Sequence, residues 1–588
     1  MNFSRLKNEG WLYGLAFLVA IGFRMIDLGA SPLTDSEATL ALQALHIAQG
    51  KAPLLGPQPG YILLTSVLFA VIESTNFMAR FVPAIAGSLL VFVPSLFREK
   101  IKPLPALLLA FFFAVDPGLV ALSRQASGTI LAVTFLLLAW GMWRNQRAVP
   151  AGIFAGLALL SGPSIWAGLL TLGLTWVFLQ GMNTKGMAND DAKIVDPSLT
   201  SLSPFANFEY RPALISLVVT LLFGGTLFFL SPNGLSAWLS ALPAYLKGWT
   251  SASPMTPGRM IFAFFAYEPL GIFLAVLSLI RGYRTGSRRI LRTSLWLGVA
   301  LLLAIFYRQT SELAWAIVPL LTLAAFELSR ALNMYAEERL EVGVVVLALI
   351  ILLVYIWFDV SKIALDPASQ FAAATLPIFG RNIPISGAPY IILIGAVLII
   401  ILCVSFVAFG WSARTAWLGT TWSFVLFLGV YSLGSAWGAS GVRSPNGLEL
   451  WTPDPAPAQA DLLHASVDDV SEFSLGHTQA QPVTIMGIDS PALEWSLKDH
   501  EVNFVSELSP QMAPPPIIVT PLMDDLGLTS AYRGQDFIWR QQPLWDTITI
   551  PDWIRWLVFR QLPRDNETIL LWVRNDLFPD ARETTQQP

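Results

Sequence analysis

Apolar segments long enough to cross a bilayer recur through the first 436 residues of this chain of 588. A helix needs about 20 apolar residues to cross a hydrocarbon core of about 30 Å. The candidate segments are 11–28, 79–97, 103–121, 128–143, 149–161, 164–180, 212–231, 259–280, 293–307, 313–328, 341–358, 388–409 and 415–436. They predict a polytopic α-helical membrane domain of about 13 transmembrane helices over residues 1–439. Because only 13% of the residues are charged, a chain made of soluble domains is excluded.

The Lys and Arg residues gather in alternate connections between these segments. The basic connections carry Arg5 and Lys7, Arg98 to Lys102, Arg144 and Arg147, Lys185 and Lys193, Arg281 to Arg292, Arg330 and Arg339, and Arg414. Basic connections face the cytoplasm. We therefore expect a multi-pass protein of the cell membrane with a cytoplasmic N-terminus and with residues 437–588 outside. Segment 11–28 lacks a cleavage site of small residues, so it is expected to be a retained anchor.

The C-terminal part has a different composition. Residues 440–588 contain 9 Lys and Arg against 21 Asp and Glu, and residues 440–459 resemble a linker. Beyond it, alternating segments predict an extracytoplasmic α/β domain over residues 460–588, with a largely parallel sheet. The expected helices are 460–474, 491–500 and 552–561, and the expected strands are 482–488, 502–506, 516–520 and 567–574. No Gly-rich phosphate loop is present, so dinucleotide binding is not supported.

Composition excludes two further kinds of function. A single cysteine, Cys403, allows neither a disulfide framework nor a Cys-based metal site. The positive charges are spread over short connections predicted to face inward, so no nucleic acid is expected as a partner. His46 is a lone histidine on an expected surface helix, and amphipathic packing explains it better than metal binding.

Two carboxylates begin the first outer connection. Apolar residues recur at helical spacing after them, which predicts an amphipathic helix on the outer membrane surface over about 35–50. Asp35 and Glu37 have two interpretations. Asp35 or Ser36 caps the helix and Glu37 is a first-turn acid favoured by the helix dipole, or the pair is a functional site at the membrane surface.

Several arginines fall on the outer side, against the positive-inside pattern. They are Arg24, Arg80, Arg124 and Arg308. The guanidinium group matches phosphate oxygens in bidentate geometry, so a lipid-linked phosphate in the outer leaflet would explain them. Pairing with nearby carboxylates would explain them without a ligand, and Arg124 also suits a snorkelling anchor at a helix end.

Carboxylates also lie within or beside later spans. Tyr267-Glu268-Pro269 falls inside a span, where a carboxylate is costly and suggests function. The alternative is that Glu268 satisfies a backbone group freed by the proline. Glu312, with Trp315 close behind, follows Arg308 at the outer end of another span.

The order of these motifs resembles the GT-C glycosyltransferases of the protein mannosyltransferase and aminoarabinose transferase type. Within them it is most similar to a bacterial and archaeal group known as flippase-activity-associated membrane proteins. The motifs are the acidic residues before Ala38, Gly56-Pro-Gln-Pro-Gly-Tyr-Ile-Leu-Leu, Arg80-Phe-Val-Pro-Ala-Ile-Ala-Gly, Ser123-Arg124, Tyr267-Glu268-Pro269, Tyr307 to Pro319, Ser490 to Asp499 and Asp552 to Arg560. The resemblance covers most of the chain.

This resemblance implies transfer of a sugar from a polyprenyl-phosphate donor to an acceptor on the outer face, with inversion at C1. A carboxylate of the first outer loop, Asp35 or Glu37, would be the general base. The acceptor is a glycan, a lipid or a protein. Donor phosphate and substrate would be bound by residues drawn from Arg24, Arg80, Arg124, Tyr267, Glu268, Arg308 and Glu312. No cofactor is required, and a divalent metal is left open.

The chain departs from the family pattern at two places. The family's Asp-Glu pair falls on Ser36-Glu37, with Asp35 displaced by one position. After Ser-Arg, where related enzymes often carry an acidic residue, this chain has Ser127-Gly128, so a metal contact that depends on that acid is absent.

Two other functions compete with transfer. A lipid-linked sugar flippase or transporter would place polar sites near the membrane midplane, often in repeated halves, whereas here they gather at outer ends of spans without a repeat. A scaffold that lost catalysis, with a partner-binding outer domain, is kept open by the altered Asp-Ser-Glu motif.

Overall fold

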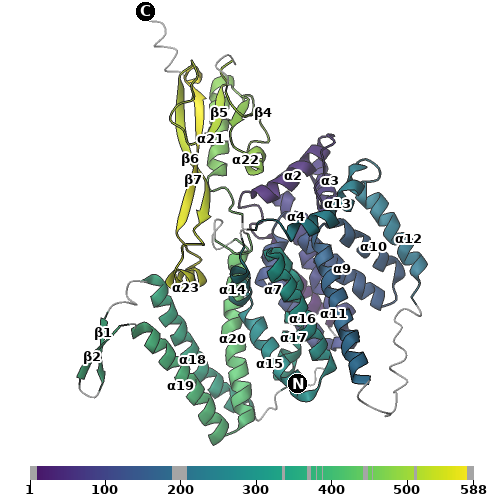
Figure 1. Cartoon of the computed structure of the whole chain (residues 1–588), viewed down its shortest axis with the longest axis vertical. Helices are drawn as coiled ribbons and strands as arrows, with labels where there is room; N and C mark the ends of the chain where they lie inside the picture. Colours follow the sequence, from purple (N-terminus) through teal and green to yellow (C-terminus); the bar gives the residue numbers. More distant parts are fainter. Residues whose placement is uncertain are drawn as a thin grey trace, which may run out of the picture.

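The computed structural model describes most of the chain. The described residues are 9–187, 208–253, 255–333, 338–366, 373–378, 381–386, 388–441, 448–452, 454–508 and 513–578. They form a bundle of helices with a sheet domain standing on one end (Figure 1). Arg5, Lys7 and Lys193, which support the predicted orientation, lie outside the described residues.

Helices make up the membrane domain, as expected. The first half contains α1 Glu9–Met25, α2 Asp35–Ala48, α3 Pro59–Val71, α4 Asn76–Leu89, η2 Leu90–Phe92, α5 Val93–Leu96, α6 Arg98–Ile101, α7 Pro103–Val115, α8 Pro117–Ser123, α9 Thr129–Arg144, α10 Ala148–Leu160 and α11 Ser164–Met187. The second half contains α12 Tyr210–Val219, η4 Thr220–Gly224, α13 Asn233–Gly248, α14 Pro257–Tyr267, α15 Pro269–Thr285, α16 Arg288–Tyr307, η5 Thr310–Leu313, α17 Ala314–Ala331, α18 Glu338–Leu365, α19 Ala388–Gly410 and α20 Ala413–Ala439. A short antiparallel hairpin, β1 Ala373–Ile378 and β2 Arg381–Ser386, lies between α18 and α19 and was not expected.

The expected number of membrane spans is not confirmed. Each predicted segment falls on a helix, but by length and composition only seven of the described helices could cross a membrane. The number rises to nine if each of two bent helix pairs is one span. Four further apolar helices have 10–17 residues. One of them, α10, has 13 residues and reaches only about 20 Å at 1.5 Å per residue.

Two of the expected spans are broken at an acidic residue followed by proline. The helices α7 and α8 meet at Asp116 with a bend of 55°, and α14 and α15 meet at Glu268 with a bend of 88°. Proline disfavours helical geometry in the residue before it and suits the first position of a new helix. Asp116 caps α8 by accepting a hydrogen bond of 2.8 Å from the Leu119 N–H. The two breaks therefore follow from local sequence.

The C-terminal domain is an α/β unit, as predicted, but its sheet is mixed. The elements are α21 Ala460–Leu475, β3 Val483–Met486, α22 Pro491–Ser496, β4 Val502–Val505, β5 Ile517–Pro521, β6 Tyr532–Pro543, α23 Ile550–Phe559, β7 Arg564–Arg574 and η7 Asn575–Leu577. The strand order is β4-β3-β5-β7-β6. Only β4, β3 and β5 are parallel, while β7 is antiparallel to both β5 and β6.

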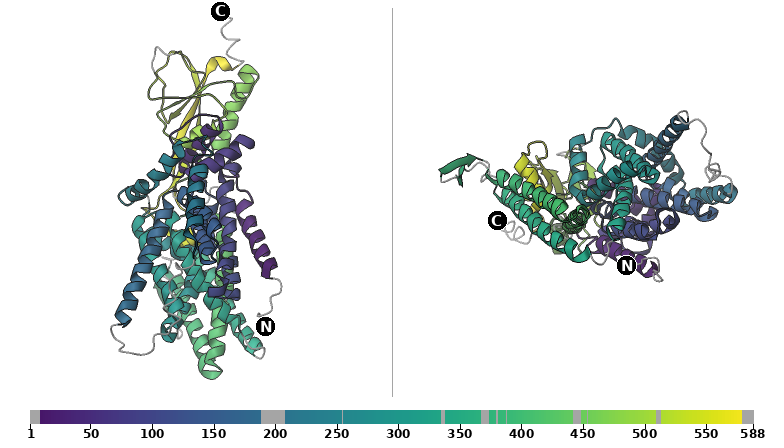
Figure 2. Two further views of the ribbon diagram at one scale, coloured as in Figure 1. Left: turned by 90° about the vertical axis from the view of Figure 1, so that its right-hand side faces the viewer. Right: turned by 90° about the horizontal axis from the view of Figure 1, so that it is seen from below.

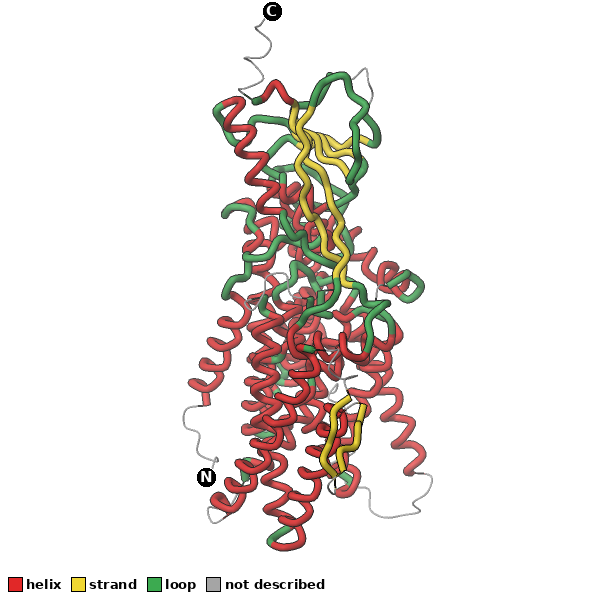
Figure 3. Tube along the Cα trace, turned by 90° about the vertical axis from the view of Figure 1, so that its left-hand side faces the viewer, coloured by secondary structure: helices red, strands yellow, loops and turns green. Residues whose placement is uncertain are grey.

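In the sheet domain, β6 is the strand that the sequence analysis did not predict. It is long, and it pairs with β7 over most of its length, so that the two form an extended ribbon that reaches down toward the membrane domain (Figures 1 and 3). Of its first five residues, Tyr532 is partly buried and the next four are exposed, and apolar alternation begins at Phe537 and Trp539. A strand with a polar first half lacks the alternation by which strands are recognised in a sequence.

The sheet domain and α2 lie at the same end of the molecule. Figure 1 and the left view of Figure 2 place both at the top, whereas α1 begins near the opposite end. The first outer connection and the C-terminal domain are thus on one side, in agreement with the predicted topology. Which side of the membrane this end faces stays a prediction.

A buried segment of the expected linker joins the two domains. Leu448, Leu450 and Trp451 are all buried. The Leu450 N–H donates a hydrogen bond of 3.0 Å to the Tyr267 hydroxyl oxygen, and the Gln125 side chain donates one of 2.8 Å to the Trp451 carbonyl. The indole of Trp451 packs so closely on α8 that a Cβ at Gly118 would lie 2.6 Å from its ring. Leu448, Leu450 and Trp451 are therefore part of the core.

Replacing this tryptophan should destabilise the whole chain. Trp451 is 1% exposed, and truncation of a buried Trp leaves a cavity that costs about 3–5 kcal/mol. We expect Trp451→Ala to lower the melting temperature of the detergent-solubilised protein markedly. Trp411→Ala, at a residue 59% exposed, is the control and should melt close to the wild type. Equal melting of the two variants would contradict the buried placement.

Candidate functional site

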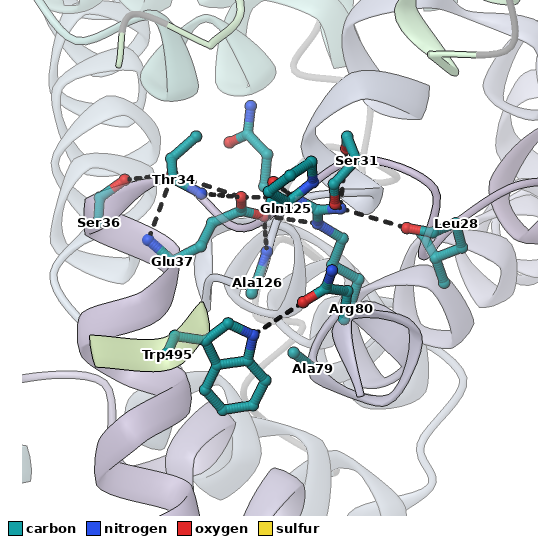
Figure 4. A network of polar contacts seen from close by, with 12 residues as sticks. Leu28, Ser31, Thr34, Ser36, Glu37, Ala79, Arg80, Gln125, Ala126 and Trp495 are labelled. Carbon is teal, nitrogen blue, oxygen red and sulfur yellow. Dashed lines mark hydrogen bonds and ion pairs between the residues drawn. The ribbon is translucent and has the colours of Figure 1, made fainter. Parts of the chain in front are cut away.

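The start of α2 is fixed by a capping box. Thr34, and not Asp35 or Ser36, is the N-cap: the Glu37 N–H donates to the Thr34 hydroxyl oxygen at 3.4 Å. In return, the Thr34 N–H donates to Oε2 of Glu37 at 3.1 Å. This reciprocal arrangement satisfies two backbone donors that a helix start leaves free. It also fixes the backbone position of Glu37 (Figure 4).

The carboxylate of Glu37 forms a buried, bidentate ion pair with Arg80. Nε of Arg80 lies 2.8 Å from Oε1 and Nη2 lies 2.7 Å from Oε2. The Ala126 N–H also donates to Oε1 at 2.8 Å. Burial alone would raise the pKa of the Glu37 carboxyl, but the Arg80 charge and these hydrogen bonds outweigh it and hold the pKa below its usual value. Glu37 therefore carries its negative charge in a fixed position.

Arg80 uses its remaining donors to hold the turn that precedes α2. Nη1 donates to the carbonyls of Leu28 and Ser31 at 3.3 and 2.8 Å, and Nη2 donates to the Pro32 carbonyl at 3.0 Å (Figure 4). Both Arg80 and Glu37 are at most 5% exposed. The guanidinium group is thus bound by protein atoms on both of its edges.

Asp35 points to the sheet domain. Its Oδ1 accepts hydrogen bonds from the Ser490 hydroxyl at 2.6 Å and from the Ala492 N–H at 3.0 Å. Oδ2 forms an ion pair with Arg540 of β6. Asp35 thus binds the N-terminal end of α22 and one strand, and it is not among the residues that line the two cavities described below.

Arg24 and Arg124 each bind the carbonyls at a helix end. Arg24 is fully buried and donates to the carbonyls of Phe113 and Ala114, both at 2.9 Å, at the end of α7. Arg124 donates to the carbonyls of Ile26 and Asp27, at 2.8 and 3.0 Å, just beyond α1. Cations favour the C-terminal ends of helices. Burial and the Arg80 charge lower the pKa of Arg124 to about 10, so it stays charged near neutral pH.

Two cavities meet at Glu37. One of about 170 Å³ lies between the membrane domain and the sheet domain, and the other, of about 370 Å³, extends along the ends of α9, α11 and η5. The residues that line both cavities are Thr34, Glu37, Gln125, Met255, Trp451, Thr452 and Asp454. The Glu37–Arg80 pair and the buried segment therefore form the wall between them.

The two cavities differ in their lining. The smaller one is also lined by Asp27, Arg80, Arg124, Arg259, Glu449, Gln541, Trp545 and Arg564. The larger one is also lined by Ser36, Gln58, Ser127, Thr129, Ser161, Ser164, Ser253, Arg308, Gln309, Thr310, Ser311 and Glu312. The larger cavity is lined by many hydroxyl and amide groups. The lining of the smaller one includes charged groups of both signs, from both domains.

Arg308 and Glu312 both line the larger cavity. Arg308 caps α16 with a positive φ of 61°, its carbonyl accepts from the Ser253 hydroxyl at 2.6 Å, and Nη2 donates to the Ser251 carbonyl at 3.4 Å. Oε2 of Glu312 accepts from the Ser164 hydroxyl at 3.0 Å. Of the predicted site residues, Glu37, Arg80, Arg124, Arg308 and Glu312 are thus brought to the two cavities.

Tyr267 and Glu268 lie outside both cavity linings. The Tyr267 hydroxyl binds the Glu449 carboxylate and the Leu450 N–H, so it anchors the buried segment. Glu268 is 3% exposed at the bend between α14 and α15, next to Asp116 at the other bend. Arg24 likewise lies outside both linings.

Sequence reasoning missed Asp454. It lines both cavities, it is partly buried, and within the described part of the chain its side chain makes no hydrogen bond or ion pair. It follows Trp451-Thr-Pro in the segment interpreted as a linker. The signal that could have identified it is a run of buried apolar residues, Leu448 to Trp451, ahead of a carboxylate in a supposed linker.

The residues around Glu37 do not fit a divalent metal. Such an ion prefers several carboxylate oxygens, but those of Glu37 are held by Arg80 and those of Asp35 by the sheet domain. At Gly128, where the family that the sequence resembles often carries an acid, a Cβ would lie 1.9 Å from the Ser161 carbonyl oxygen. Within the described ranges, the one group of three metal-ligating side chains near enough to share an ion lies in the sheet domain.

Comparison with known proteins finds similar structures only. No family model matches the sequence, and no curated protein matches it. The chain is similar to ArnT from Cupriavidus metallidurans bound to undecaprenyl phosphate, with 14% identity and a TM-score of 0.49 over 87% of this chain and 93% of that one. It is also similar to the oligosaccharyltransferase AglB from Archaeoglobus fulgidus in complex with an inhibitory peptide and a dolichol-phosphate, with 13% identity and a TM-score of 0.44 over 87% and 69%.

Breaking the Glu37–Arg80 pair on one side should destabilise the protein. Glu37→Gln leaves the Arg80 charge buried without its counter-ion, which costs about 3–5 kcal/mol. We expect a large fall in melting temperature, with partial recovery in Glu37→Gln/Arg80→Met, where both charges are removed.

The pair of Arg98 and Glu9 serves as the control. Its atoms are 3.1 Å apart, and its side chains are 54% and 21% exposed. Because exposed pairs contribute at most about 1 kcal/mol, Glu9→Gln should change melting little. A Glu37→Gln variant as stable as the wild type would contradict the structural role.

A side chain at position 128 should not be tolerated. Gly128→Ala would drive Cβ into the Ser161 carbonyl, which is backbone and cannot move aside, so we expect little folded protein. Gly173→Ala is the control, because a Cβ added at this position of α11 would meet nothing within 4 Å and Ala favours helices over Gly. The measurement is the yield of monodisperse protein in detergent for the Gly128→Ala and Gly173→Ala variants. Equal yields would mean that the loop at 128 is not packed as described.

Proposed function

We propose that this chain is a membrane glycosyltransferase that moves a sugar from a polyprenyl-phosphate donor to an acceptor at the membrane surface, with inversion at C1. The observation that carries the proposal is that a polar cavity and a second cavity toward the sheet domain share one wall, which contains Glu37 and Asp454. Two substrates could meet there. The order of the sequence motifs supports the same donor class.

The larger cavity suits the sugar of the donor. Its many hydroxyl and amide groups can exchange hydrogen bonds with sugar hydroxyls. Arg308, in the same lining, would pair with the donor phosphate.

The smaller cavity would receive the acceptor. Gln541, Trp545 and Arg564 of the sheet domain line it together with Arg80 and Arg124 of the membrane domain. The sheet domain would therefore contribute to the choice of acceptor. The acceptor would be a glycan, a lipid or a protein.

The transfer itself would be a single displacement. The acceptor hydroxyl oxygen attacks C1 of the sugar, the bond from C1 to the phosphate oxygen breaks, and the phosphate leaves with its electron pair beside Arg308. The hydroxyl proton passes to a carboxylate acting as general base. Attack opposite the leaving group inverts C1.

We assign the base role to Asp454. Glu37, the residue that the family resemblance favours with Asp35, has both carboxylate oxygens engaged by Arg80, Ala126 and Thr34. Asp35 is bound to the sheet domain instead. Asp454 lines both cavities with its carboxylate unengaged by the described residues. Asp35 and Glu37 would then act as positioning residues.

Release of polyprenyl phosphate from a labelled lipid-linked sugar, by the full chain in membranes, tests the proposal. Loss of a general base lowers rates by about 10²–10⁴-fold. We expect Asp454→Asn to show such a loss at an unchanged melting temperature. Asp565→Asn, at an exposed residue of β7, is the matched control and should retain full activity.

Three results would overturn parts of the proposal. Activity retained in Asp454→Asn removes that residue as the base. A loss confined to Glu37→Gln at unchanged stability returns the base role to Glu37. Movement of the lipid-linked sugar across vesicles without any release of polyprenyl phosphate would assign the chain to the flippase class.

A further inference from the structure

A cluster of two histidines and an aspartate lies in the sheet domain. His464 and Asp468 are four residues apart on α21, so they share one face of that helix. His500 lies between α22 and β4 in the sequence and joins them in space. The ligand atoms of the three side chains all lie within 4.8 Å of one another.

The distances within the cluster match coordination to one ion. Nε2 of His500 is 2.9 Å from Oδ1 of Asp468, and Nε2 of His464 is 3.4 Å from Oδ2 of Asp468. Bonds of about 2.0–2.1 Å in a tetrahedral site place neighbouring ligand atoms about 3.3 Å apart. The two distances lie on either side of that value.

The two ring nitrogens of His500 are placed as in a metal ligand. Nδ1 lies 3.4 Å from the Gln481 carbonyl oxygen, an arrangement that suits an Nδ1–H donor, and Nε2 faces the Asp468 carboxylate. A metal-ligating histidine usually donates its other N–H to a carbonyl or carboxylate in this way.

The rings of His464 and His500 lie with their centroids 6.0 Å apart, beside the one carboxylate of Asp468. Nδ1 of His464 is buried and has no partner among the described residues. One divalent ion would accept an electron pair from each of the three side chains at once.

We propose that His464, Asp468 and His500 bind a Zn²⁺ ion, with water at the fourth position. Imidazole and carboxylate ligands in a tetrahedral arrangement favour zinc over Mg²⁺ or Ca²⁺, which prefer oxygen ligands in larger number. The His500 side chain is fully buried, whereas those of His464 and Asp468 are 34% and 26% exposed. The ion can therefore enter from the solvent side of α21.

The site would brace the part of the sheet domain that docks on the membrane domain. His500 follows α22, whose first residues bind Asp35 and whose Trp495 donates to Asn76 at 2.8 Å. Zinc would connect this region to α21. The inference does not depend on the proposed sugar transfer, because no cluster residue lines either cavity.

Zinc binding by the full chain tests the proposal. Protein without a polyhistidine tag is stripped with a chelator, dialysed and titrated with Zn²⁺ by calorimetry, and Co²⁺ is used as a spectroscopic substitute. We expect one ion per chain, a tetrahedral Co²⁺ spectrum, a rise in melting temperature with Zn²⁺ and no effect of Mg²⁺. His464→Ala and Asp468→Asn, at partly exposed positions, should each weaken binding at least tenfold.

His477→Ala is the matched control, because His477 is an exposed histidine of the same domain. It should bind zinc like the wild type. The proposal is overturned if the stripped wild type takes up no stoichiometric zinc, or if His464→Ala and Asp468→Asn bind it with unchanged affinity. It is also overturned if Asp468→Asn lowers the melting temperature equally with and without Zn²⁺, since the cluster is then an ion pair.

Discussion

The buried ion pair of Glu37 and Arg80 organises the end of the membrane domain on which the sheet domain stands. It connects α2 to α4 across 43 residues of sequence, and each partner also binds backbone groups, the Ala126 N–H on one side and the carbonyls before α2 on the other. Removing two charges from water is costly, and the cost is offset only when nearly every donor and acceptor is satisfied. That condition is met here, since Arg80 and Glu37 are bound by each other and by backbone groups.

Because these charged groups are already bound by protein atoms, they are less able to bind a ligand. Arg24 and Arg124 close helix ends, Arg80 holds Glu37, and Asp35 holds Arg540. The arginines that the sequence analysis interpreted as a phosphate site thus mainly hold the fold together. The groups that stay available at the cavities are Arg308, which the sequence analysis named, and Asp454, which lies in a supposed linker.

The sequence predicted the helical character of the apolar segments. It did not predict the Thr34 to Glu37 capping box, where Asp35 or Ser36 was expected as the cap, or the breaks at Asp116-Pro117 and Glu268-Pro269, although these features depend on residues within one or two turns. The expected number of spans is not confirmed, because four of the described apolar helices have only 10–17 residues. Partners far apart in sequence could not be predicted, since Asp35 and Arg540 are 505 residues apart and meet only when the domains dock.

The smaller cavity exists only because the domains dock, and both ion pairs and apolar packing connect the two domains. Asp35 binds α22 and β6, and Arg259 forms an ion pair with Asp546. The carboxylates of Asp35 and Asp546 are 28% and 90% exposed, and partly hydrated pairs contribute little free energy. Apolar packing must therefore supply most of the attachment: Leu448, Leu450 and Trp451 are buried, and Trp553 and Trp556 of α23 pack on Phe262 of α14. Because Asp454 follows Trp451 closely in the sequence, this packing ends beside the carboxylate that lines both cavities.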